Sequence, residues 1–191
     1  GCGSVNFLIL FNEKKDRCLS VAAQVADFFS KKGGVVYMEE AVRGFSEMKI
    51  PNAHYFGKEL PEELCAAVVI GGDETILRAA RLLYGRDVPI VGINLGTVGY
   101  LTELEVGECE LLEKLFELRR GIPAGVSLDE RMMLSFRVVR SGKTAHEGVA
   151  LNEVVLAKGE ISRMIDVDLS HDESTVTSYQ CDGVIVSTPT G

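Results

Sequence analysis

The first part of the chain alternates continuous apolar runs with stretches of helical periodicity. Residues 5–10 (VNFLIL) form an apolar run typical of a strand that is covered on both faces. Apolar residues then recur at spacings of three and four from Leu19 to Phe29, which predicts a helix. Gly33 and Gly34 follow and are expected to end this helix before the next strand.

The same alternation continues as far as residue 121. We expect further strands at 35–38, 65–70 and 89–93, and further helices at 74–85 and 110–121. Strands that alternate with helices indicate βαβ units and a parallel sheet. The sequence therefore predicts an α/β domain with a Rossmann-like parallel sheet.

The pattern changes near residues 119–125 (RRGIPAG), where glycines and a proline indicate loops. Five strand-like segments follow without an intervening helix: 131–140, 148–159, 164–170, 174–180 and 182–189. We therefore expect two domains, an α/β domain over 1–120 and a β-rich substrate-binding domain over 121–191. We expect this second domain to be incomplete at its C-terminus.

Composition narrows the function classes. The 191 residues are 46% hydrophobic, and 20 basic against 28 acidic residues give a net charge of −8. This charge disfavours non-specific attraction to nucleic acid or to anionic lipid. No apolar stretch approaches the roughly 18 residues of a membrane span, and there is no signal-peptide pattern, so we expect a cytoplasmic protein. The five scattered cysteines have no C-x-x-C spacing and are expected to be buried thiols.

A Gly-Gly-Asp segment stands where the strand at 65–70 meets the following helix. Gly71, Gly72 and Asp73 lie at the carboxyl end of that strand, which is the usual ligand edge of a parallel sheet. Glycines there allow a phosphate or ribose to approach the backbone, and the helix start favours anions. The alternative is that Asp73 or Thr75 is only an N-cap, a role worth about 1 kcal/mol.

A second glycine-rich exit follows the next strand. Gly92, Gly96 and Gly99 lie in the segment GINLGTVGYLTEL, and two adjacent loops without bulky side chains predict a shared ligand cleft. The spacing is not G-x-G-x-x-G, so it is no dinucleotide fingerprint of that type.

Polar groups interrupt the apolar runs of the β-rich part. Asn152 and Glu153 are adjacent and are suited to hydrogen bonds with ribose hydroxyls or a base edge. Their alternative is a loop or bulge at the start of a strand. Asp182 and Gly183 are equally compatible with a plain turn, and Thr190 with a polar loop.

Taken together and in this order, six segments resemble the NAD kinase family. They are NFLILFNEKK, VVIGGDETILRAAR, GINLGTVGYLTELE, DERMML, ALNEVVLAKG and DGVIVSTPTG, and they cover nearly the whole chain. G-G-D-G alone also occurs in lipid kinases and phosphofructokinases, so the combination carries the resemblance.

The resemblance implies transfer of the γ-phosphoryl group of ATP to the 2′-hydroxyl of the adenosine ribose of NAD, which gives NADP. It also implies a divalent metal ion, usually Mg²⁺, polyphosphate as a donor in some members, and a homodimer or homotetramer. Asp73 would be the general base toward the 2′-hydroxyl, or would orient the metal.

The family's substrate contacts carry over to ten positions. These are Gly71, Gly72, Asp73, Glu74, Arg78, Asn152, Glu153, Arg163, Asp182 and Thr190. Among them, Asn152 and Glu153 match the motif that holds NAD. For the two arginines the alternatives are a surface arginine on a helix and a solvated arginine on a strand.

Three departures from the family pattern stand out. Glu74 replaces the glycine of G-G-D-G-T, which would cost about 1–3 kcal/mol if the backbone there needs a positive φ. Its charge would also repel a phosphate by about 4 kcal/mol at 4 Å and an effective dielectric of 20. Gln180 stands where many members have a basic residue, and the family continues beyond STPTG, so we expect the native protein to be longer.

Three functions follow from these observations. The first is an ATP-dependent NAD kinase. The second is a lipid or sugar kinase of the same superfamily, which the Asn-Glu and Asp-Gly pairs disfavour. The third is a non-catalytic NAD(H)- or NADP(H)-binding protein in which Glu74 prevents phosphate binding.

Overall fold

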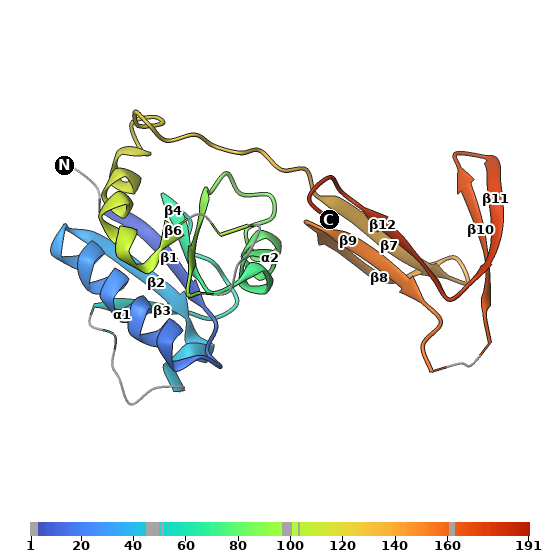
Figure 1. The fold of residues 1–191 in the computed structure, drawn as a ribbon, viewed down its shortest axis with the longest axis horizontal. Helices are drawn as coiled ribbons and strands as arrows, with labels where there is room; N and C mark the ends of the chain where they lie inside the picture. The colour runs from blue at the N-terminus through green and yellow to red at the C-terminus, as the bar shows by residue number, and fades with distance from the viewer. Residues whose placement is uncertain (1–3, 45–49, 51, 97–100, 103, 161–162) are drawn as a thin grey trace. The chain divides into compact units, whose positions relative to one another are not determined.

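The computed structural model describes residues 4–44, 50, 52–96, 101–102, 104–160 and 163–191. Contacts divide the chain into two compact units, Gly1–Asp129 and Glu130–Gly191, which are coloured blue to yellow and orange to red in Figure 1. By their contacts, residues 121–129 belong to the first unit, whereas the sequence analysis placed the domain boundary at 120/121.

The first unit is built on a six-stranded parallel sheet with the order β3-β2-β1-β4-β5-β6. The strands are β1 (Val5–Phe11), β2 (Gly34–Glu39), β3 (Ala53–Phe56), β4 (Ala66–Ile70), β5 (Ile90–Asn94) and β6 (Leu104–Glu105). The direction of strand addition reverses between β1 and β4. In sheets of this order, ligands bind at that reversal, outside the carboxyl ends of the strands.

Two helices cover opposite faces of this sheet, α1 (Asp16–Lys31) and α2 (Asp73–Leu82) (Figure 1). Alternate residues of β1 point to the two opposite faces of the sheet. Phe7 and Ile9 pack in the cluster that contains α1, whereas Leu8 and Leu10 pack in the cluster that contains α2. Because both faces are buried, six of the seven residues of the strand are apolar, and Asn6 is the exception.

Two 3-10 helices complete the first unit, η1 (Glu40–Gly44) and η2 (Val106–Glu117). The helix expected at 110–121 is present as η2, but as a 3-10 helix that begins earlier. It contributes Phe116, whose ring contacts Phe7 and Phe29 edge-on. The elements η1, β3 and β6 were not predicted, because each is too short to give a periodic pattern.

The second unit contains three antiparallel strand pairs, β7-β8, β10-β11 and β9-β12. Their bounds are β7 (Leu134–Arg140), β8 (Lys143–Ala150), β9 (Glu153–Ala157), β10 (Ile165–His171), β11 (Ser174–Cys181) and β12 (Gly183–Ser187). Ser141 and Gly142 join β7 to β8 with φ angles of 49° and 74°, as a tight hairpin requires. Each strand-like segment of the sequence contains a strand here.

Burial differs sharply between the two units. Among its described residues only Leu151 and Thr188 are buried. No helix in the described part of either unit is long and apolar enough to cross a membrane.

Candidate functional site at the carboxyl edge of the sheet

Gly71 continues the ladder beyond β4. Its N–H donates to the carbonyl of Ile93 at 3.1 Å, which holds the start of the Gly-Gly-Asp segment against β5. Its φ is +153°, and a Cβ atom there would lie 2.6 Å from Oγ1 of Thr75. Glycine is therefore required at position 71 by both backbone conformation and space.

Gly72 is the N-cap of α2 and has a different reason to be glycine. Its φ is −100°, and a Cβ atom there would meet nothing within 4 Å. The folded chain thus leaves open space beside this residue, next to the start of a helix, where backbone N–H groups favour an anion. Because Gly72 is the N-cap, the interpretation of Asp73 or Thr75 as the N-cap is wrong.

Asp73 is the first residue of α2, and its carboxylate links the two glycine-rich exits. Oδ1 of Asp73 accepts a hydrogen bond from the backbone N–H of Leu101 at 3.1 Å. Leu101 comes after β5 in the chain, so this residue lies beside the Gly-Gly-Asp segment. This bond fixes the orientation of a half-buried carboxylate at the ligand edge of the sheet.

Gly92 and Gly96 have separate roles at the second exit. A Cβ atom on Gly92 would lie 2.8 Å from Cδ1 of Ile76 and 3.1 Å from Cα of Thr102, so this glycine permits close packing between β5, α2 and the loop. Gly96 has a φ of +100°. Gly99 lies outside the described residues, and the shared ligand cleft stays a prediction.

Glu74 is exposed and lies in the first turn of α2. The described non-glycine residues with positive φ are Asn52, Ser141 and Asp172, so the backbone strain considered for Glu74 does not arise. A helical residue has no need for the positive φ that favours glycine. A carboxylate in the first turn also interacts favourably with the helix dipole.

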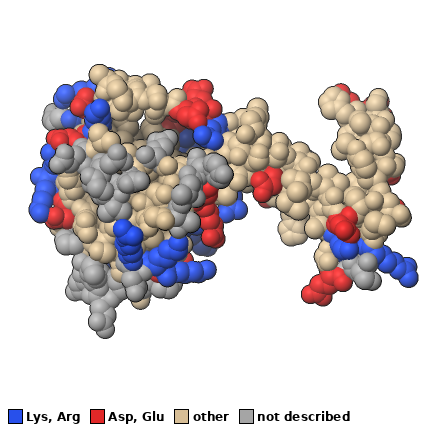
Figure 2. Space-filling view, viewed as in Figure 1, with Lys and Arg blue, Asp and Glu red and all other residues tan. Residues whose placement is uncertain are grey.

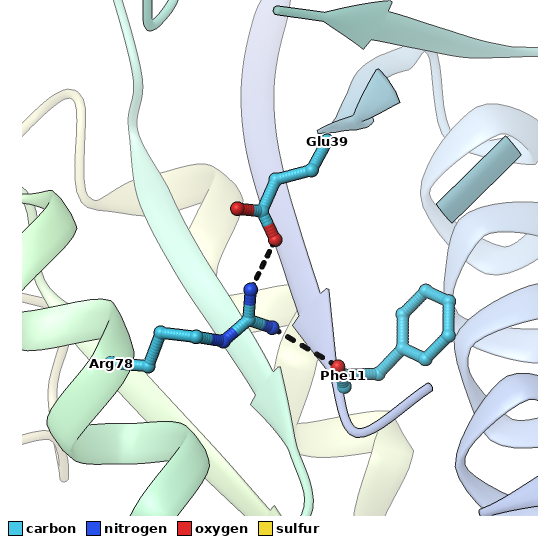
Figure 3. Close-up of polar contacts among 3 residues, drawn as sticks. All are labelled: Phe11, Glu39 and Arg78. Carbon is cyan, nitrogen blue, oxygen red and sulfur yellow. Dashed lines mark hydrogen bonds and ion pairs between the residues drawn. The ribbon is translucent and has the colours of Figure 1, made fainter. Parts of the chain in front are cut away.

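Arg78 ties α2 to the carboxyl ends of two strands (Figure 3). Nη1 donates to the carboxylate of Glu39 at the end of β2, and Nη2 donates to the carbonyl of Phe11 at the end of β1, at 3.1 Å. The guanidinium is therefore held by two partners at the strand ends, unlike the surface arginine on a helix that was the alternative for Arg78. Contact between Arg78 and NAD stays a prediction.

Three further cations border this edge, and the sequence analysis did not single them out. Lys14 and Lys15 precede α1 directly, and Arg17 in its first turn donates from Nη1 to the carbonyl of Leu95 at 3.2 Å. The signal was available in the segment NEKKDR, which has three basic and two acidic residues and directly follows a buried strand. Positive side chains here suit a phosphorylated ligand.

The thiol of Cys18 is fully buried beneath these cations. Burial raises the pKa of Cys18, and the Asn12 backbone together with the charges of Lys15 and Arg17 offsets part of that increase. Burial also raises the pKa of Cys65, whose Sγ donates to the carbonyl of Leu115 at 3.3 Å. Cys18 is a buried thiol, as the sequence predicted, whereas Cys65 and Cys181 are only partly buried.

In the second unit, Asn152 and Glu153 lie at one end of the β9-β12 pair. Ser187 is opposite Glu153 in the register, and the N–H of Thr188 donates to the carbonyl of Asn152 at 2.7 Å. The hydroxyl of Thr188 donates to the carbonyl of Leu151. Thr188 of the STPTG segment therefore holds Leu151 and Asn152 through one hydroxyl and one backbone hydrogen bond.

Oδ1 of Asn152 is buried and, among the described residues, has no hydrogen-bond partner. A buried acceptor without a partner costs about 1–3 kcal/mol, so a ligand that donates a hydrogen bond would relieve it. Gly191 lies against this pair, because a Cβ atom there would be 2.8 Å from Oε2 of Glu153. Thr190 joins the same end, and its Oγ1 accepts from Nη1 of Arg131 at 3.3 Å.

The structure does not bring Asp182 to this end of the strand pair. Asp182 precedes β12, pairs with Nζ of Lys158 at 2.6 Å and has a side chain that is 74% exposed. The register runs from Gly183 opposite Ala157 to Ser187 opposite Glu153, which is four residue steps, or about 14 Å. A ligand that contacts both Asn152 and Asp182 would have to span that distance.

The two remaining sequence positions lie on or beside the β10-β11 pair. Arg163 is exposed two residues before β10. Gln180 donates from Nε2 to Oδ1 of Asp166 across the pair at 3.3 Å. The uncharged residue at 180 thus has a partner within the pair. Substrate contact by Arg163 stays a prediction.

The described residues contain no group of three or more His, Cys, Asp or Glu side chains arranged to hold a metal ion. A magnesium ion carried by a nucleotide needs no such cage, because one or two carboxylates together with the phosphates complete its coordination. Asp73 supplies a carboxylate of the right type at the ligand edge. The donor set therefore fits Mg²⁺ bound together with phosphate.

Comparison with known proteins was made for the whole chain. Residues 7–119 match the ATP-NAD kinase N-terminal domain, and residues 151–191 match the ATP-NAD kinase C-terminal domain. Relatives named NAD kinase include that of Heliobacterium modesticaldum, 37% identical over 96% of this chain and 62% of the relative. That of Nitratidesulfovibrio vulgaris is 45% identical over 68% of this chain and 44% of the relative.

Structural comparison agrees on the fold. The crystal structure of yeast NADH kinase complexed with NADH matches with a TM-score of 0.79 and 20% identity, over 98% of this chain and 58% of that one. The chain thus spans about 60% of the length of that protein and of the H. modesticaldum relative. Because residues 7–119 and 151–191 match the two domains of this family, the chain belongs to the NAD kinase family.

Proposed function

We propose that the protein is an NAD kinase, which transfers the γ-phosphoryl group of ATP to the 2′-hydroxyl of the adenosine ribose of NAD and forms NADP. Membership of the family supports this activity. The observation that carries it is the position of Asp73, an oriented carboxylate at the ligand edge of the sheet beside the open space at Gly72.

Asp73 acts as the proton acceptor for the 2′-hydroxyl. Its hydrogen bond from the N–H of Leu101 limits the rotation of the carboxylate, which reduces the cost of ordering it for the reaction. A positioned base of this kind contributes about 10²–10⁴-fold to rate. The rest of the rate enhancement in phosphoryl transfer comes from positioning of the reacting groups and from stabilisation of charge in the transition state.

The donor phosphates lie against the Gly71–Gly72 backbone and the start of α2. The cations Lys14, Lys15 and Arg17 offset phosphate charge from the neighbouring exit of β1. Mg²⁺, when bound, would neutralise charge that develops on the phosphate oxygens. In the alternative to its role as the base, Asp73 would orient that ion. Polyphosphate is a second donor, because this edge recognises phosphate groups rather than a nucleobase.

Asn152 and Glu153 bind NAD, with Oδ1 of Asn152 as an acceptor for a hydroxyl or amino group. Arg78, Arg163, Asp182 and Thr190 are further contacts inferred from the family. The homodimer or homotetramer and the cytoplasmic location expected from the sequence stay predictions. Glu74 does not favour the non-catalytic alternative, because it is helical and exposed.

The activity is tested by incubation of the protein with NAD, ATP and Mg²⁺, followed by enzymatic detection of NADP. We expect NADP formation, and a loss of 100-fold or more in kcat for Asp73→Asn. Asp27→Asn is the matched control, because Asp27 forms only an exposed pair with Lys31 on α1. No NADP above the level without enzyme would refute the proposal.

Two further measurements separate the other functions. Transfer of label from ATP to a lipid or a sugar, with none to NAD, would identify the second function. Calorimetric binding of NAD or NADP without turnover would identify the third. NADH and polyphosphate, each replacing NAD or ATP in the same assay, define the substrate range.

A further inference from the structure

We infer that Glu39, oriented by Arg78, binds the cis-diol of a ribose at the carboxyl edge of β2. This inference rests on the proposed function, in which a nucleotide lies along this edge of the sheet. It assigns a ligand-binding role to Glu39, which the sequence analysis did not single out.

The position of Glu39 is the first argument. It is the last residue of β2, which pairs with β1, which in turn pairs with β4. Two strand spacings separate β2 from β4, roughly 10 Å. A nucleotide whose phosphates lie at Gly71–Gly72 can place its ribose over the end of β2. In sheets with this strand order, an acidic residue at such a position commonly accepts hydrogen bonds from a ribose.

The orientation of Glu39 is the second argument. Tyr37 lies two residues earlier on β2 and packs in the cluster that contains α2, so Glu39 faces the same side of the sheet. Arg78 reaches across from α2 and donates to Oε2 of Glu39 with one nitrogen, while another donates to the carbonyl of Phe11 (Figure 3). The forked guanidinium thus holds the carboxylate against two strand ends.

The third observation concerns Oε1, the second oxygen of the Glu39 carboxylate. Oε1 of Glu39 accepts no hydrogen bond from any described residue, and 24% of the side chain is exposed. An ionised carboxylate only accepts hydrogen bonds, and each oxygen can accept more than one. It therefore matches adjacent hydroxyl donors and repels a phosphate, which is the discrimination that a ribose site beside a phosphate site requires.

Arg78 is the positioning residue in this arrangement. Its charge balances that of Glu39, so the pair adds little net charge beside Lys14, Lys15 and Arg17. Its bond to the Phe11 carbonyl fixes the guanidinium with respect to β1. A purely structural pair would use the same contacts, so the test must measure recognition of hydroxyl groups rather than stability alone.

The test is calorimetric binding to the wild-type protein, Glu39→Ala and Glu39→Gln. The probes are ATP, 2′-deoxy-ATP, 3′-deoxy-ATP and inorganic tripolyphosphate, which has no ribose. We expect the wild type to bind ATP about ten-fold more tightly than at least one deoxy analogue, and Glu39→Ala to remove that preference. Tripolyphosphate should bind all three proteins equally.

A second arm identifies which nucleotide supplies the ribose. The same proteins are titrated with NAD and with its 3′-deoxyadenosine analogue. Loss of the hydroxyl preference for ATP alone assigns the site to the phosphoryl donor, and loss for NAD alone assigns it to the acceptor. Either result supports the proposal, because the recognised group is a ribose diol in both.

Glu40→Ala is the matched control, since Glu40 is the next residue and forms an exposed pair with Arg43. It should keep the hydroxyl preference. If Glu39→Ala and Glu39→Gln weaken ATP, the deoxy analogues and tripolyphosphate by the same factor, or if the preference persists, the inference is overturned. Binding needs no turnover, so absence of NADP formation by the wild type would refute the proposed function separately.

Discussion

The two units of the chain contain similar apolar strands but bury them to very different extents. In the first unit, both faces of β1 and β4 are covered, and every residue of β4 is buried. In the second unit, Val155 and Leu156 on β9 are 57% and 56% exposed, and Ile185 and Val186 on β12 are 66% and 48% exposed. On the face shown in Figure 2, the second unit is largely tan, with few charged side chains over its strands.

The exposed residues of the second unit lie on both sides of its strand pairs. Neighbouring residues on a strand point to opposite faces, so exposure of Val155 together with Leu156 leaves neither face of the β9-β12 pair fully covered. A strand pair becomes a stable core only when another layer covers it. An apolar sequence thus predicts a strand in both units, but burial requires a neighbouring layer.

The same contrast applies to the two groups of candidate residues. Asp73 and Arg78 are held by hydrogen bonds to backbone groups of a buried sheet and its loops. Asn152 and Thr190 lie at the end of a largely exposed strand pair, where Asn152 leaves a buried oxygen without a described partner. The positions of the candidate side chains are therefore specified more strongly in the first unit.

The largest effect is expected in the aromatic core of the first unit. Phe29→Ala should lower the free energy of unfolding by about 3–5 kcal/mol, because Phe29 is fully buried and stacks on Phe7 at 4.0 Å between ring centroids. Val155→Ala in the second unit should cost less than about 1 kcal/mol, because that side chain is 57% exposed. Denaturant unfolding of both variants measures the difference, and equal losses would contradict the contrast.

The next effect separates two glycines at the candidate site. Gly92→Ala should cost about 1–3 kcal/mol of stability, since its Cβ would lie 2.8 Å from Cδ1 of Ile76. Gly72→Ala should change stability little, because the space there is open, but it should weaken ATP binding if a phosphate occupies that space. Thermal unfolding and calorimetry check both, and unchanged ATP binding by Gly72→Ala would argue against this position of the phosphates.

A smaller effect is expected for Glu74→Gly. The substitution should cost about 1 kcal/mol of stability, because glycine is a poor helix former and a favourable charge at the helix start is lost. It should lower the KM for ATP, because it removes a carboxylate that repels phosphate. Glu62→Gly, at an exposed position before β4, is a control for KM. A raised KM would show that Glu74 assists binding.

The smallest effect concerns the thiols of Cys18 and Cys65. Burial raises the pKa of each in the folded protein, so the unfolded chain ionises first as the pH rises. The contribution of the two neutral thiols to the free energy of unfolding is complete below the usual thiol pKa of about 8.5. It is lost as the pH rises through the raised folded pKa values. Cys18→Ser should reduce this loss between pH 8 and 10, as measured by denaturant unfolding. If the free energy of unfolding changes with pH in the variant as in the wild type, Cys18 makes no such contribution.

Alkylation of the folded protein gives an independent measure of the same contrast. Cys18 is fully buried in the first unit, whereas Cys181 in the second unit is partly exposed. Cys181 should react with iodoacetamide first, as followed by peptide mass spectrometry. Reaction of Cys18 at an equal rate would show that the first unit opens readily.

Much of the fold could be predicted because it depends on strong local patterns. The apolar run of β1, the periodicity of α1 and the glycines after β4 each follow directly from neighbouring residues. The short strand β3 could not be predicted, since only Phe56 of its four residues is buried. Likewise, η2 became a 3-10 helix where helical periodicity predicted an ordinary helix.

The candidate site divides in the same way. The sequence identified Asp73 and Asn152 from polar residues at the ends of apolar strands. It could not show that Leu101 orients Asp73, or that Arg78 pairs with Glu39, which is 39 residues away along the chain. Nor could it show that Asp182 lies at the opposite end of a strand pair from Asn152, because that distance depends on register.

The sequence by itself determined the α/β order, the β-rich second part and the family, because these depend on the succession of residues along the chain. The tertiary structure decided which carboxylates and cations meet at the carboxyl edge, and how completely each unit is buried. Both depend on strand order and on layers, which bring together residues that are distant in sequence. For this reason Glu39 became a candidate only when β2 was placed beside β1 and opposite α2.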